Sequence, residues 1–308
     1  MQKIILSKTR KGSEGLIRPW IRIGDMAALR IMLCEWRTRT PDDRLIVVYD
    51  PQDERHEYSK HFPHEWAFSD VADELWIRDT KGEKIKIDVP ELWNINNDVN
   101  GVQRRDVWEF WKTIRPNKPR FTPALDMPEE RTIEAAAALK HYGVPAEYAV
   151  LQMLFDAGYD KYRNAPISWW RDLAMRIAAM HVPLVIVGPS RLMTNFTAPP
   201  GCFPLYKTVS DPFNSLALMA GAKLVIAGES GLIHWATFLR KPTIATYRHW
   251  APRDERCDFR PVSWGAPMLP VELESSATKI AETVRVAYNA ACAPAPRARA
   301  GTQPSSGS

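Results

Sequence analysis

Short apolar runs that alternate with helical patterns constrain the fold of this chain more than any other feature. Leu45–Tyr49 and Val182–Val187 are continuous apolar runs, as expected of strands that are buried on both faces of a parallel sheet. Segments such as Asp25–Arg37 and Ser168–Met180 instead repeat apolar residues every three or four positions, which predicts helices. Strands separated by helices form βαβ units, so the sequence predicts an α/β fold with parallel sheets.

The predicted elements fall into two α/β blocks that meet near residues 115–127. The chain has 308 residues, enough for two domains that each bury a core. We expect an N-terminal lobe over residues 1–125, a C-terminal lobe over 126–292 and a disordered tail over 293–308, where Pro, Ala, Gly and Ser dominate. Ile85–Val89 is a further expected strand and Val107–Ile114 an expected helix. Residues 51–127 otherwise carry no recognisable pattern.

Several classes of protein are excluded by composition and by short motifs. The longest apolar runs are far shorter than the roughly 20 residues that a membrane span needs, so no integral membrane segment is expected. The N-terminal residues lack the apolar core and cleavage site of a signal peptide. The four cysteines are isolated and form no CxxC pair, which argues against a zinc site and a disulfide scaffold. We therefore expect a cytoplasmic, reduced protein.

Positive charge is concentrated near the start of the chain. The formal net charge is +5, yet residues 1–40 alone carry nine basic and three acidic side chains. A long loop over residues 8–22 is expected to hold much of this charge, on Lys8, Arg10, Lys11, Arg18 and Arg22. Such a local excess favours an anionic partner, which could be a nucleotide phosphate, a lipid headgroup or a nucleic acid. A solvated basic loop is the plainer alternative.

The segment over residues 220–247 predicts a strand, a tight turn, a helix, a Lys-Pro turn and a second strand. Its turn, Gly228-Glu229-Ser230-Gly231, lies where a strand ends and a helix begins, which is where open α/β sheets bind ligands. The N–H groups of Ser230 and Gly231 can face a phosphate there. Glu229 can accept hydrogen bonds from sugar hydroxyls, and His234 can donate to a phosphate. Alternatively, the turn is an ordinary βα connection and His234 a core residue.

This segment resembles the nucleotide-sugar motif of heptosyltransferase-type GT-B glycosyltransferases. The motif reads roughly aadlvvg-D-S/T-G-x-x-H-l-A-a-a-l-g-k-P-t. The chain keeps six of its positions in register: Ser230, Gly231, His234, Ala236, Lys241 and Pro242. It departs at Glu229, where the family usually has Asp, so the carboxylate is kept on a longer side chain.

The resemblance extends upstream of this motif. Residues 160–174 are similar to a family region whose lysine contacts the donor phosphates, which selects Lys161 and, more weakly, Arg163. The strand over 182–187 and the following Gly188 match the family's vvl-G-g-p element. Residues 150–153 stand where the family usually has an lhpg-like sequence, and that sequence is absent here.

A third match lies near the N-terminus. Residues 22–30 resemble the family's s-l/i-G-D-v-l-x-t-l-P-a-l-r pattern, in which the Asp is the catalytic base, and this selects Asp25. Gly24 lets the chain turn into a helix, and the helix dipole would lower the pKa of a carboxylate at its start. Asp25 could instead be only a helix N-cap. The family's proline is absent, and residues 8–21 form a long insertion.

The resemblance implies a GT-B-like fold, with two Rossmann-like parallel-sheet lobes that face a central cleft. It implies a glycosyltransferase, of hexosyl- or heptosyl-transferase type, that moves a sugar from a nucleotide-sugar donor to an acceptor hydroxyl. The acceptor would be a saccharide or a glycolipid, and the configuration at the transferred sugar would invert. No cofactor beyond the nucleotide-sugar co-substrate is expected, and no metal, because no DxD-type motif is evident. Positive side chains and helix N-termini would stabilise the leaving nucleotide diphosphate.

Two other functions stay open. The basic N-terminal segment and the twelve tryptophans fit a DNA glycosyltransferase that acts on hydroxymethylated pyrimidine bases, since aromatic side chains can stack on an extruded base. Tryptophans are more often packing residues. The departures at Glu229 and around Gln152 also fit a non-catalytic, nucleotide-binding module on a degenerate transferase scaffold.

Overall fold

The structure is a computed structural model of the chain. It describes the residues in these ranges: 3–7, 9–11, 17–19, 23–39, 41–42, 44–49, 63–77, 102–106, 124–153, 165–188, 193, 195–209, 211–228, 230–247, 268–272 and 275–293.

A four-stranded parallel sheet occupies the N-terminal part of the chain. Its strands are β1 (Lys3–Ser7), β4 (Arg44–Tyr49), β5 (Glu74–Ile77) and β6 (Val102–Asp106), in the order β5-β4-β1-β6. Each neighbouring pair is parallel. The helix α1 (Ile23–Arg39) connects β1 to β4, and the short α3 (His64–Phe68) precedes β5. The apolar run at Leu45–Tyr49 therefore forms a strand with neighbours on both sides, as its composition predicts.

A six-stranded parallel sheet occupies the C-terminal part, in the order β12-β11-β10-β7-β8-β9. Its strands are β7 (Ala149–Gln152), β8 (Leu184–Val187), β9 (Cys202–Phe203), β10 (Leu224–Gly228), β11 (Thr243–Tyr247) and β12 (Met268–Glu272). Its helices are α5 (Glu129–His141), α6 (Ile167–Ala179), the 3-10 turn η4 (Leu205–Lys207), α7 (Pro212–Gly221), α8 (Gly231–Phe238) and α9 (Ala277–Cys292). The two sheets confirm the predicted α/β class.

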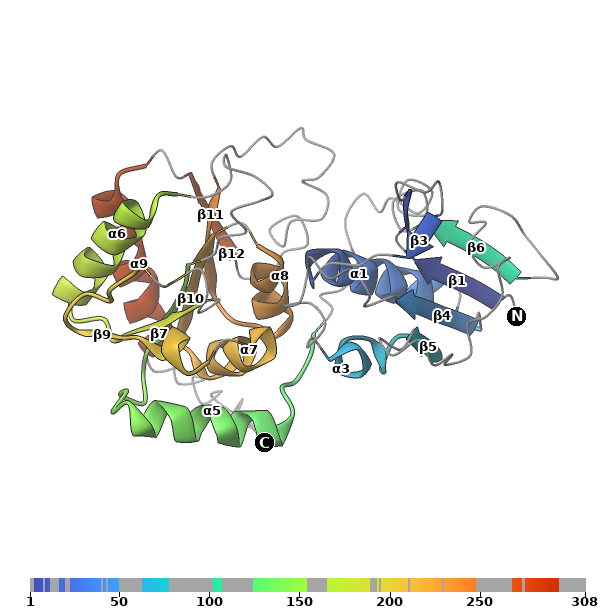
Figure 1. Cartoon of the computed structure of the whole chain (residues 1–308), viewed down its shortest axis with the longest axis horizontal. Coiled ribbons are helices and arrows are strands. Elements are labelled where there is room, and N and C mark those ends of the chain that lie inside the picture. The colour runs from blue at the N-terminus through green and yellow to red at the C-terminus, as the bar shows by residue number, and fades with distance from the viewer. Residues whose placement is uncertain are drawn as a thin grey trace, which may run out of the picture.

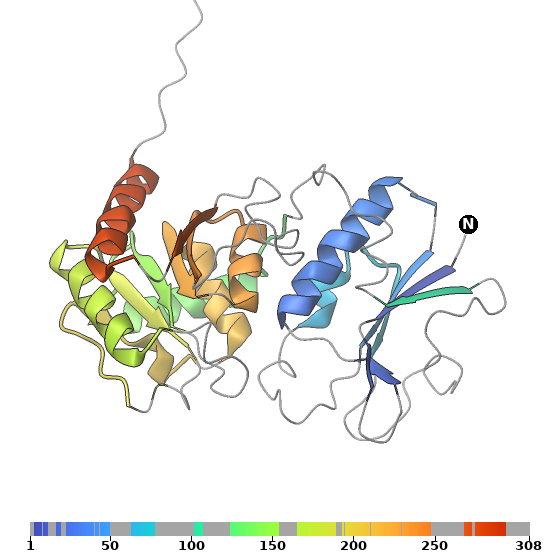
Figure 2. The ribbon, with the colours of Figure 1, turned by 90° about the horizontal axis from the view of Figure 1, so that it is seen from above.

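Alternate side chains of the second sheet enter two different cores, so this part of the chain has three layers. In β7, Val150 packs with α5, α7 and α8, whereas Leu151 packs with α6 and α9. The view in Figure 2 shows α6 and α9 on the side of the sheet that faces away from α1. Because both faces are covered, the strands read as continuous apolar runs instead of alternating ones.

The two sheets are joined by a buried apolar core. The helix α1 packs against its own sheet and also against α8, and Figure 1 shows the two helices lying between the sheets. One cluster of buried side chains includes Met26 and Leu29 of α1, Phe68 of α3, and Trp235 and Phe238 of α8. The helix α8 is buried on nearly every side, which accounts for its apolar sequence.

The basic segment before α1 differs from the expected loop. Strands β2 (Thr9–Lys11) and β3 (Ile17–Pro19) pair in an antiparallel hairpin, with Arg10 directly opposite Arg18. The prediction of a loop over residues 8–22 is therefore wrong for these two stretches. The physical reason is that two short segments close together in the sequence pair with each other, which a charge pattern alone does not indicate.

Some expected elements lie outside the described residues. These are the strand over Ile85–Val89, the helix over Val107–Ile114 and the tail after residue 293. Within the described part of the chain, no helix has the length and apolar character that a membrane crossing requires.

Candidate active site

The connections of the second sheet create a crevice position between β7 and β10. The chain passes from β7 to its neighbour β8 on one side, and then returns to place β10 on the other side of β7. The order of the strands thus reverses between β7 and β10. Open α/β sheets bind ligands at such a point, outside the carboxyl ends of the strands. The residues that follow β7 and β10 are therefore the candidates for ligand binding.

Ser230 and Gln152 meet across this position. Gln152 is the last residue of β7, and Ser230 follows β10 and precedes α8. The hydroxyl of Ser230 donates to Oε1 of Gln152 at 3.1 Å. This hydrogen bond links the carboxyl ends of the two strands that flank the crevice.

The first turn of α8 lacks a side-chain cap from its own N-cap residue. Ser230 has the extended backbone of an N-cap, with φ −145° and ψ 166°, but its side chain makes no capping hydrogen bond. Serine is among the favoured N-cap residues because its oxygen normally accepts from the N–H groups two or three positions on. Here the hydroxyl points to Gln152, to which it donates, and its oxygen accepts no N–H of the first turn. The N–H groups at the start of α8, with the positive end of the helix dipole, form an arrangement suited to an anion.

Two buried donors near this edge have no acceptor. Nε2 of Gln152 and Nε1 of Trp170 are buried and make no hydrogen bond within the described part of the chain, and Gln152 is 0% exposed. An unsatisfied buried donor costs about 1–3 kcal/mol. Gln152 and Trp170 are the residues that sequence reasoning missed as site candidates. The signal for Gln152 was its polar side chain at the end of an apolar strand.

Glycines allow close packing at the same edge. A Cβ on Gly228, the last residue of β10, would lie 3.3 Å from the indole of Trp170. A Cβ on Gly188, which follows β8, would lie 2.7 Å from the carbonyl oxygen of Met153, and Gly188 has a φ of +156°. Only glycine fits without displacement at Gly188, because the neighbouring atom belongs to the backbone.

Several residues predicted from the sequence come together here. Ser230 and Gly231 lie at the start of α8, His234 lies one turn into that helix, and Gly188 directly follows the strand β8 on the other side of β7. Lys161, Arg163 and Glu229 lie outside the described residues.

The motif residue Lys241 lies apart from this edge. It precedes β11, at the opposite, amino-terminal edge of the sheet. Burial, followed by the nearby charges of Lys223 and Arg240, lowers the pKa of Lys241. Its place in the motif therefore reflects the turn that leads into β11, not a position in the crevice.

Asp25 lies in the first turn of α1. The helix begins at Ile23, so Gly24 and Asp25 are its second and third residues, and Asp25 is not the N-cap. The helix that carries Asp25 packs on α8, the helix that begins at the crevice. Of the basic residues selected from the sequence, Arg10 and Lys11 belong to β2 and Arg18 to β3. Lys8 and Arg22 are outside the described residues.

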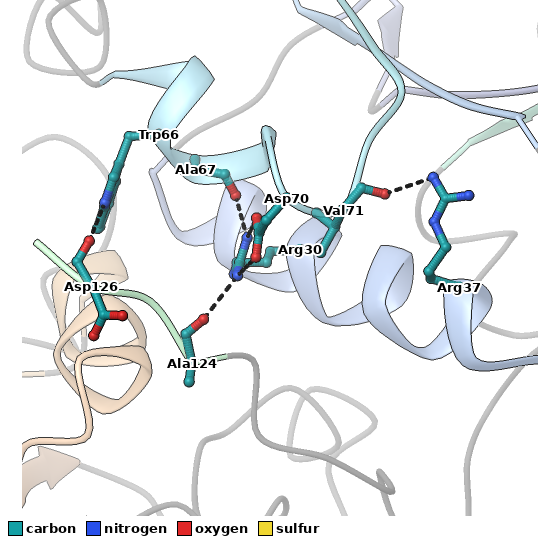
Figure 3. Close-up of polar contacts among 8 residues, drawn as sticks. All are labelled: Arg30, Arg37, Trp66, Ala67, Asp70, Val71, Ala124 and Asp126. Atoms are coloured by element: carbon teal, nitrogen blue, oxygen red, sulfur yellow. Dashed lines mark hydrogen bonds and ion pairs between the residues drawn. The ribbon is translucent and has the colours of Figure 1, made fainter. Parts of the chain in front are cut away.

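Arg30 holds the middle of α1 in place. Its guanidinium is 1% exposed and binds Asp70 through two hydrogen bonds of 2.6 and 2.7 Å (Figure 3). It also donates to the carbonyl oxygens of Ala67 at 2.8 Å and Ala124 at 3.0 Å. Partial burial favours the protonated form of Asp70, but the hydrogen bonds and charge of Arg30 outweigh it and lower the pKa of that carboxyl.

The segment Ala124–Asp126, which leads into the second sheet, is bound from both sides. Arg30 of α1 donates to the carbonyl of Ala124, and the N–H of Leu125 donates to Phe238 of α8 at 2.9 Å. The indole of Trp66 donates to the carbonyl of Asp126 at 2.9 Å, as Figure 3 shows, and Arg240 pairs with the Asp126 carboxylate. Consecutive residues are thus held alternately by the two halves of the chain, which fixes α1 relative to α8.

The tryptophans whose side chains the structure describes are packing residues. Trp170 and Trp235 are fully buried. Trp66 packs against Trp235 and Phe213, with ring centroids 5.4 and 5.0 Å apart. Trp169 lies edge-to-face with Trp170 at 5.0 Å. Trp170 and Trp235 are therefore enclosed in the core, and Trp66 and Trp169 are partly buried against other aromatic rings.

Metal-ligating and nucleophilic groups are not gathered in the described ranges. No group of three His, Cys, Asp or Glu side chains that could hold a metal ion occurs among those residues. Cys34, Cys202 and Cys292 are free thiols. Burial raises the pKa of Cys34 to about 12 despite the nearby charge of Arg30, so this thiol stays protonated near neutral pH.

Comparison with solved structures decides the fold. The chain is similar to a glycosyl transferase family 9 protein from Veillonella parvula, with a TM-score of 0.61 and 11% identity over 94% of this chain and 97% of that one. It is also similar to the ADP-heptose lps heptosyltransferase II of E. coli, with a TM-score of 0.57 and 13% identity over 94% of this chain and 99% of that one. The chain has the GT-B fold. No protein-family model and no curated protein matches it by sequence. In this GT-B chain, the crevice between β7 and β10 belongs to the C-terminal sheet.

Proposed function

We propose that this GT-B chain is a glycosyltransferase that moves a sugar from a nucleotide-sugar donor to an acceptor hydroxyl. The observation that carries the proposal is the first turn of α8, which lies at the strand-order reversal and is not capped by Ser230. A nucleotide sugar carries a diphosphate, which is the kind of anion that such a helix start binds. The similarity to a family 9 glycosyl transferase supports the same class of reaction.

The donor would lie with its diphosphate on α8. The N–H groups of Gly231 and the next residues would bind phosphate oxygens, and His234 would donate one turn farther along. Lys161 and Arg163 are the proposed cationic partners, and Glu229 is the proposed acceptor for sugar hydroxyls. Gly188 would allow the backbone after β8 to approach the donor.

Asp25 is the proposed general base. It would take the proton of the acceptor hydroxyl, whose oxygen attacks the anomeric carbon as the bond to the nucleotide diphosphate breaks. Attack from the face opposite the leaving group inverts the configuration at that carbon. Asp25 lies in the first turn of α1, the end of the helix at which its dipole is positive.

The leaving diphosphate gains negative charge as the bond breaks. We propose that helix N–H groups and positive side chains stabilise this charge without an obligatory metal. The basic residues Lys8, Arg10, Lys11, Arg18 and Arg22 would bind either the donor phosphates or a charged acceptor. The proposed acceptor is a saccharide or a glycolipid.

A transfer assay with Asp25→Asn tests this proposal. Purified chain is incubated with a panel of nucleotide sugars, mixed saccharide and glycolipid acceptors and EDTA, and release of nucleoside diphosphate is measured. We expect release with at least one donor, and a loss of about 10²–10⁴-fold in kcat for Asp25→Asn, the usual contribution of a general base. Binding of the nucleoside diphosphate should stay within about twofold, because the substitution removes only a proton acceptor.

The matched control is Asp42→Asn, an exposed aspartate in the turn that follows α1. It should retain wild-type turnover. Equal activity of Asp25→Asn and Asp42→Asn would show that Asp25 is not the general base. A wild-type chain that binds nucleoside diphosphates and turns over no donor would favour the non-catalytic alternative.

Transfer to DNA is the second candidate reaction. Four of the twelve tryptophans have side chains that the structure describes, and these four are packed within the protein, so stacking of one of the other eight on an extruded base stays a prediction. Electrophoretic retardation at low salt, with and without hydroxymethylated pyrimidines in the duplex, separates the two acceptors. Retardation that requires the modified base would restore the DNA hypothesis.

A further inference from the structure

The side chain of Ser230 bonds to Gln152 and does not cap α8. An N-cap serine usually stabilises its helix by about 0.5–2 kcal/mol relative to alanine when its oxygen accepts from the first turn. Ser230 has the N-cap backbone, yet its hydroxyl donates to Gln152 at 3.1 Å and forms no capping bond. At the same time Nε2 of Gln152 is buried without an acceptor. The start of α8 therefore lacks both a side-chain cap for the helix and an acceptor for Nε2 of Gln152.

Both absences are explained if an anion occupies the start of α8. The helix N–H groups that Ser230 does not cap would then find acceptors on the anion. Nε2 belongs to the amide that holds the Ser230 hydroxyl, so it lies beside the same helix start and could donate to that anion as well. Buried polar groups normally have partners, so an orphaned donor next to an uncapped helix start indicates a missing ligand.

We propose that Gln152 is a positioning residue for the donor diphosphate: it draws the Ser230 hydroxyl away from the first turn of α8 and adds an N–H donor to the anion bound there. This inference rests on the proposed function and names a residue that the family motif does not contain. Gln152 stands where the resembling family usually has an lhpg-like sequence, so the role belongs to this chain.

The proposal predicts that diphosphate binding weakens without a loss of stability. In Gln152→Leu, the orphaned donor is removed and Ser230 is released to cap α8, so Tm should equal or exceed that of the wild type. The dissociation constant for pyrophosphate should rise about tenfold, since a hydrogen bond to a charged group is lost. In Ser230→Asp, a carboxylate caps the helix and gives Nε2 an acceptor. Its Tm should rise, and pyrophosphate binding should fall about 100-fold, because the carboxylate repels the anion.

Calorimetric titrations with inorganic pyrophosphate, ADP, UDP and GDP test this prediction, alongside titrations with adenosine and uridine, which lack phosphate. Ser215→Ala is the matched control, because Ser215 is a buried serine whose hydroxyl donates at 3.0 Å to the Asp211 carbonyl at the start of its own helix, α7. Its diphosphate binding should be unchanged.

The outcomes separate this inference from the proposed function. A wild-type chain that binds none of the diphosphates overturns both. Wild-type binding together with unchanged affinity in Gln152→Leu and Ser230→Asp overturns the role of Gln152 alone. A fall in Tm accompanied by equal loss of nucleoside and diphosphate binding would also overturn it, because that pattern indicates a merely structural residue.

Discussion

Arg30 is a positive charge almost completely withdrawn from water, and its partners determine how α1 is held. Its guanidinium is 1% exposed, whereas the side chain of Asp70 is 51% exposed. Burying a charge is unfavourable unless it is paired and hydrogen-bonded. The carboxylate of Asp70 and the carbonyls of Ala67 and Ala124 meet that requirement for the two terminal nitrogens of the guanidinium. Sequence reasoning gave no role to Arg30, since its partners lie 37 to 94 positions away.

Asp70→Asn should destabilise the chain by removing the charge that compensates Arg30. Loss of one partner of a buried pair costs about 3–5 kcal/mol, and the exposure of Asp70 reduces the expected cost to about 2 kcal/mol. The pKa of Asp70 is lowered in the folded state. Its contribution is therefore present above its unfolded pKa of about 3.9 and is lost as the pH falls through the folded pKa.

Urea unfolding at several pH values measures this effect. The difference between wild type and Asp70→Asn should be full near pH 7 and should shrink below about pH 4. Asp172→Asn is the control, because Asp172 pairs with Arg176 on the exposed face of α6. It should change stability by less than about 0.5 kcal/mol. A difference for Asp70→Asn that grows with falling pH would contradict the assignment.

Gly188→Ala should be destabilising because of a collision with the backbone. Its Cβ would lie 2.7 Å from the carbonyl oxygen of Met153, and the positive φ adds strain. We expect a loss of about 1–3 kcal/mol in the free energy of unfolding, measured in urea. Gly143→Ala is the comparison, because Gly143 has a φ of +65° with nothing within 4 Å. It should lose only the conformational cost of about 1–2 kcal/mol, and a larger loss there than at Gly188 would refute the collision.

At the scale of elements, the sequence predicts the strands and helices of the C-terminal sheet well. The strands at 182–187 and 223–227 and the helix at 231–239 follow from apolar runs and glycine positions, and the structure has β8, β10 and α8 there. Such local patterns predict elements because a strand that is buried on both faces of a parallel sheet consists of a continuous apolar run.

Short or edge elements were missed for the opposite reason. The strand β6 reads Val-Gln-Arg-Arg-Asp and β9 has only two residues, so neither has an apolar run. Each forms because a neighbouring strand offers unpaired backbone groups, β1 for β6 and β8 for β9. In the same way, the hairpin of β2 and β3 depends on pairing between two charged segments. Tertiary context decides such strands.

The contact between α1 and α8 predicts a large effect of Trp235→Ala. Trp235 is fully buried and lies edge-to-face with Phe238 at 5.3 Å. Removing the indole should cost about 3–5 kcal/mol in the free energy of unfolding, measured in urea. Trp169→Ala provides the comparison, because Trp169 is only half-buried and should cost about half as much. Similar losses for the two substitutions would contradict the central place of α8 in the core.

At the scale of the whole molecule, the two sheets share one apolar cluster and are connected by a segment that side chains from both halves bind. The cluster runs from Leu45 in the first sheet through α1 and α8 to Val225 in the second. The residues at 124–126 are bound alternately from the two sides. This arrangement links the helix that carries Asp25 to the helix that begins at the crevice. Sequence patterns predicted the two blocks, but the packing between them depends on contacts distant in sequence.

Only part of the candidate site could be predicted, because some of its contacts join residues that are distant in sequence. Ser230, Gly231 and His234 belong to one local motif, so their joint position followed from the sequence. Gln152 reaches that motif from 78 positions away. Only the strand order, with β7 beside β10, brings its amide to Ser230.

We propose that a nucleotide sugar binds through its diphosphate at the start of α8. Thermal unfolding of the wild-type chain with a panel of nucleoside diphosphates and nucleotide sugars measures this binding. We predict that one nucleoside series raises Tm, with a stabilisation of about 2.7 kcal/mol when the ligand is at 100 times its dissociation constant. The absence of any shift across the panel at millimolar concentration would contradict the claim.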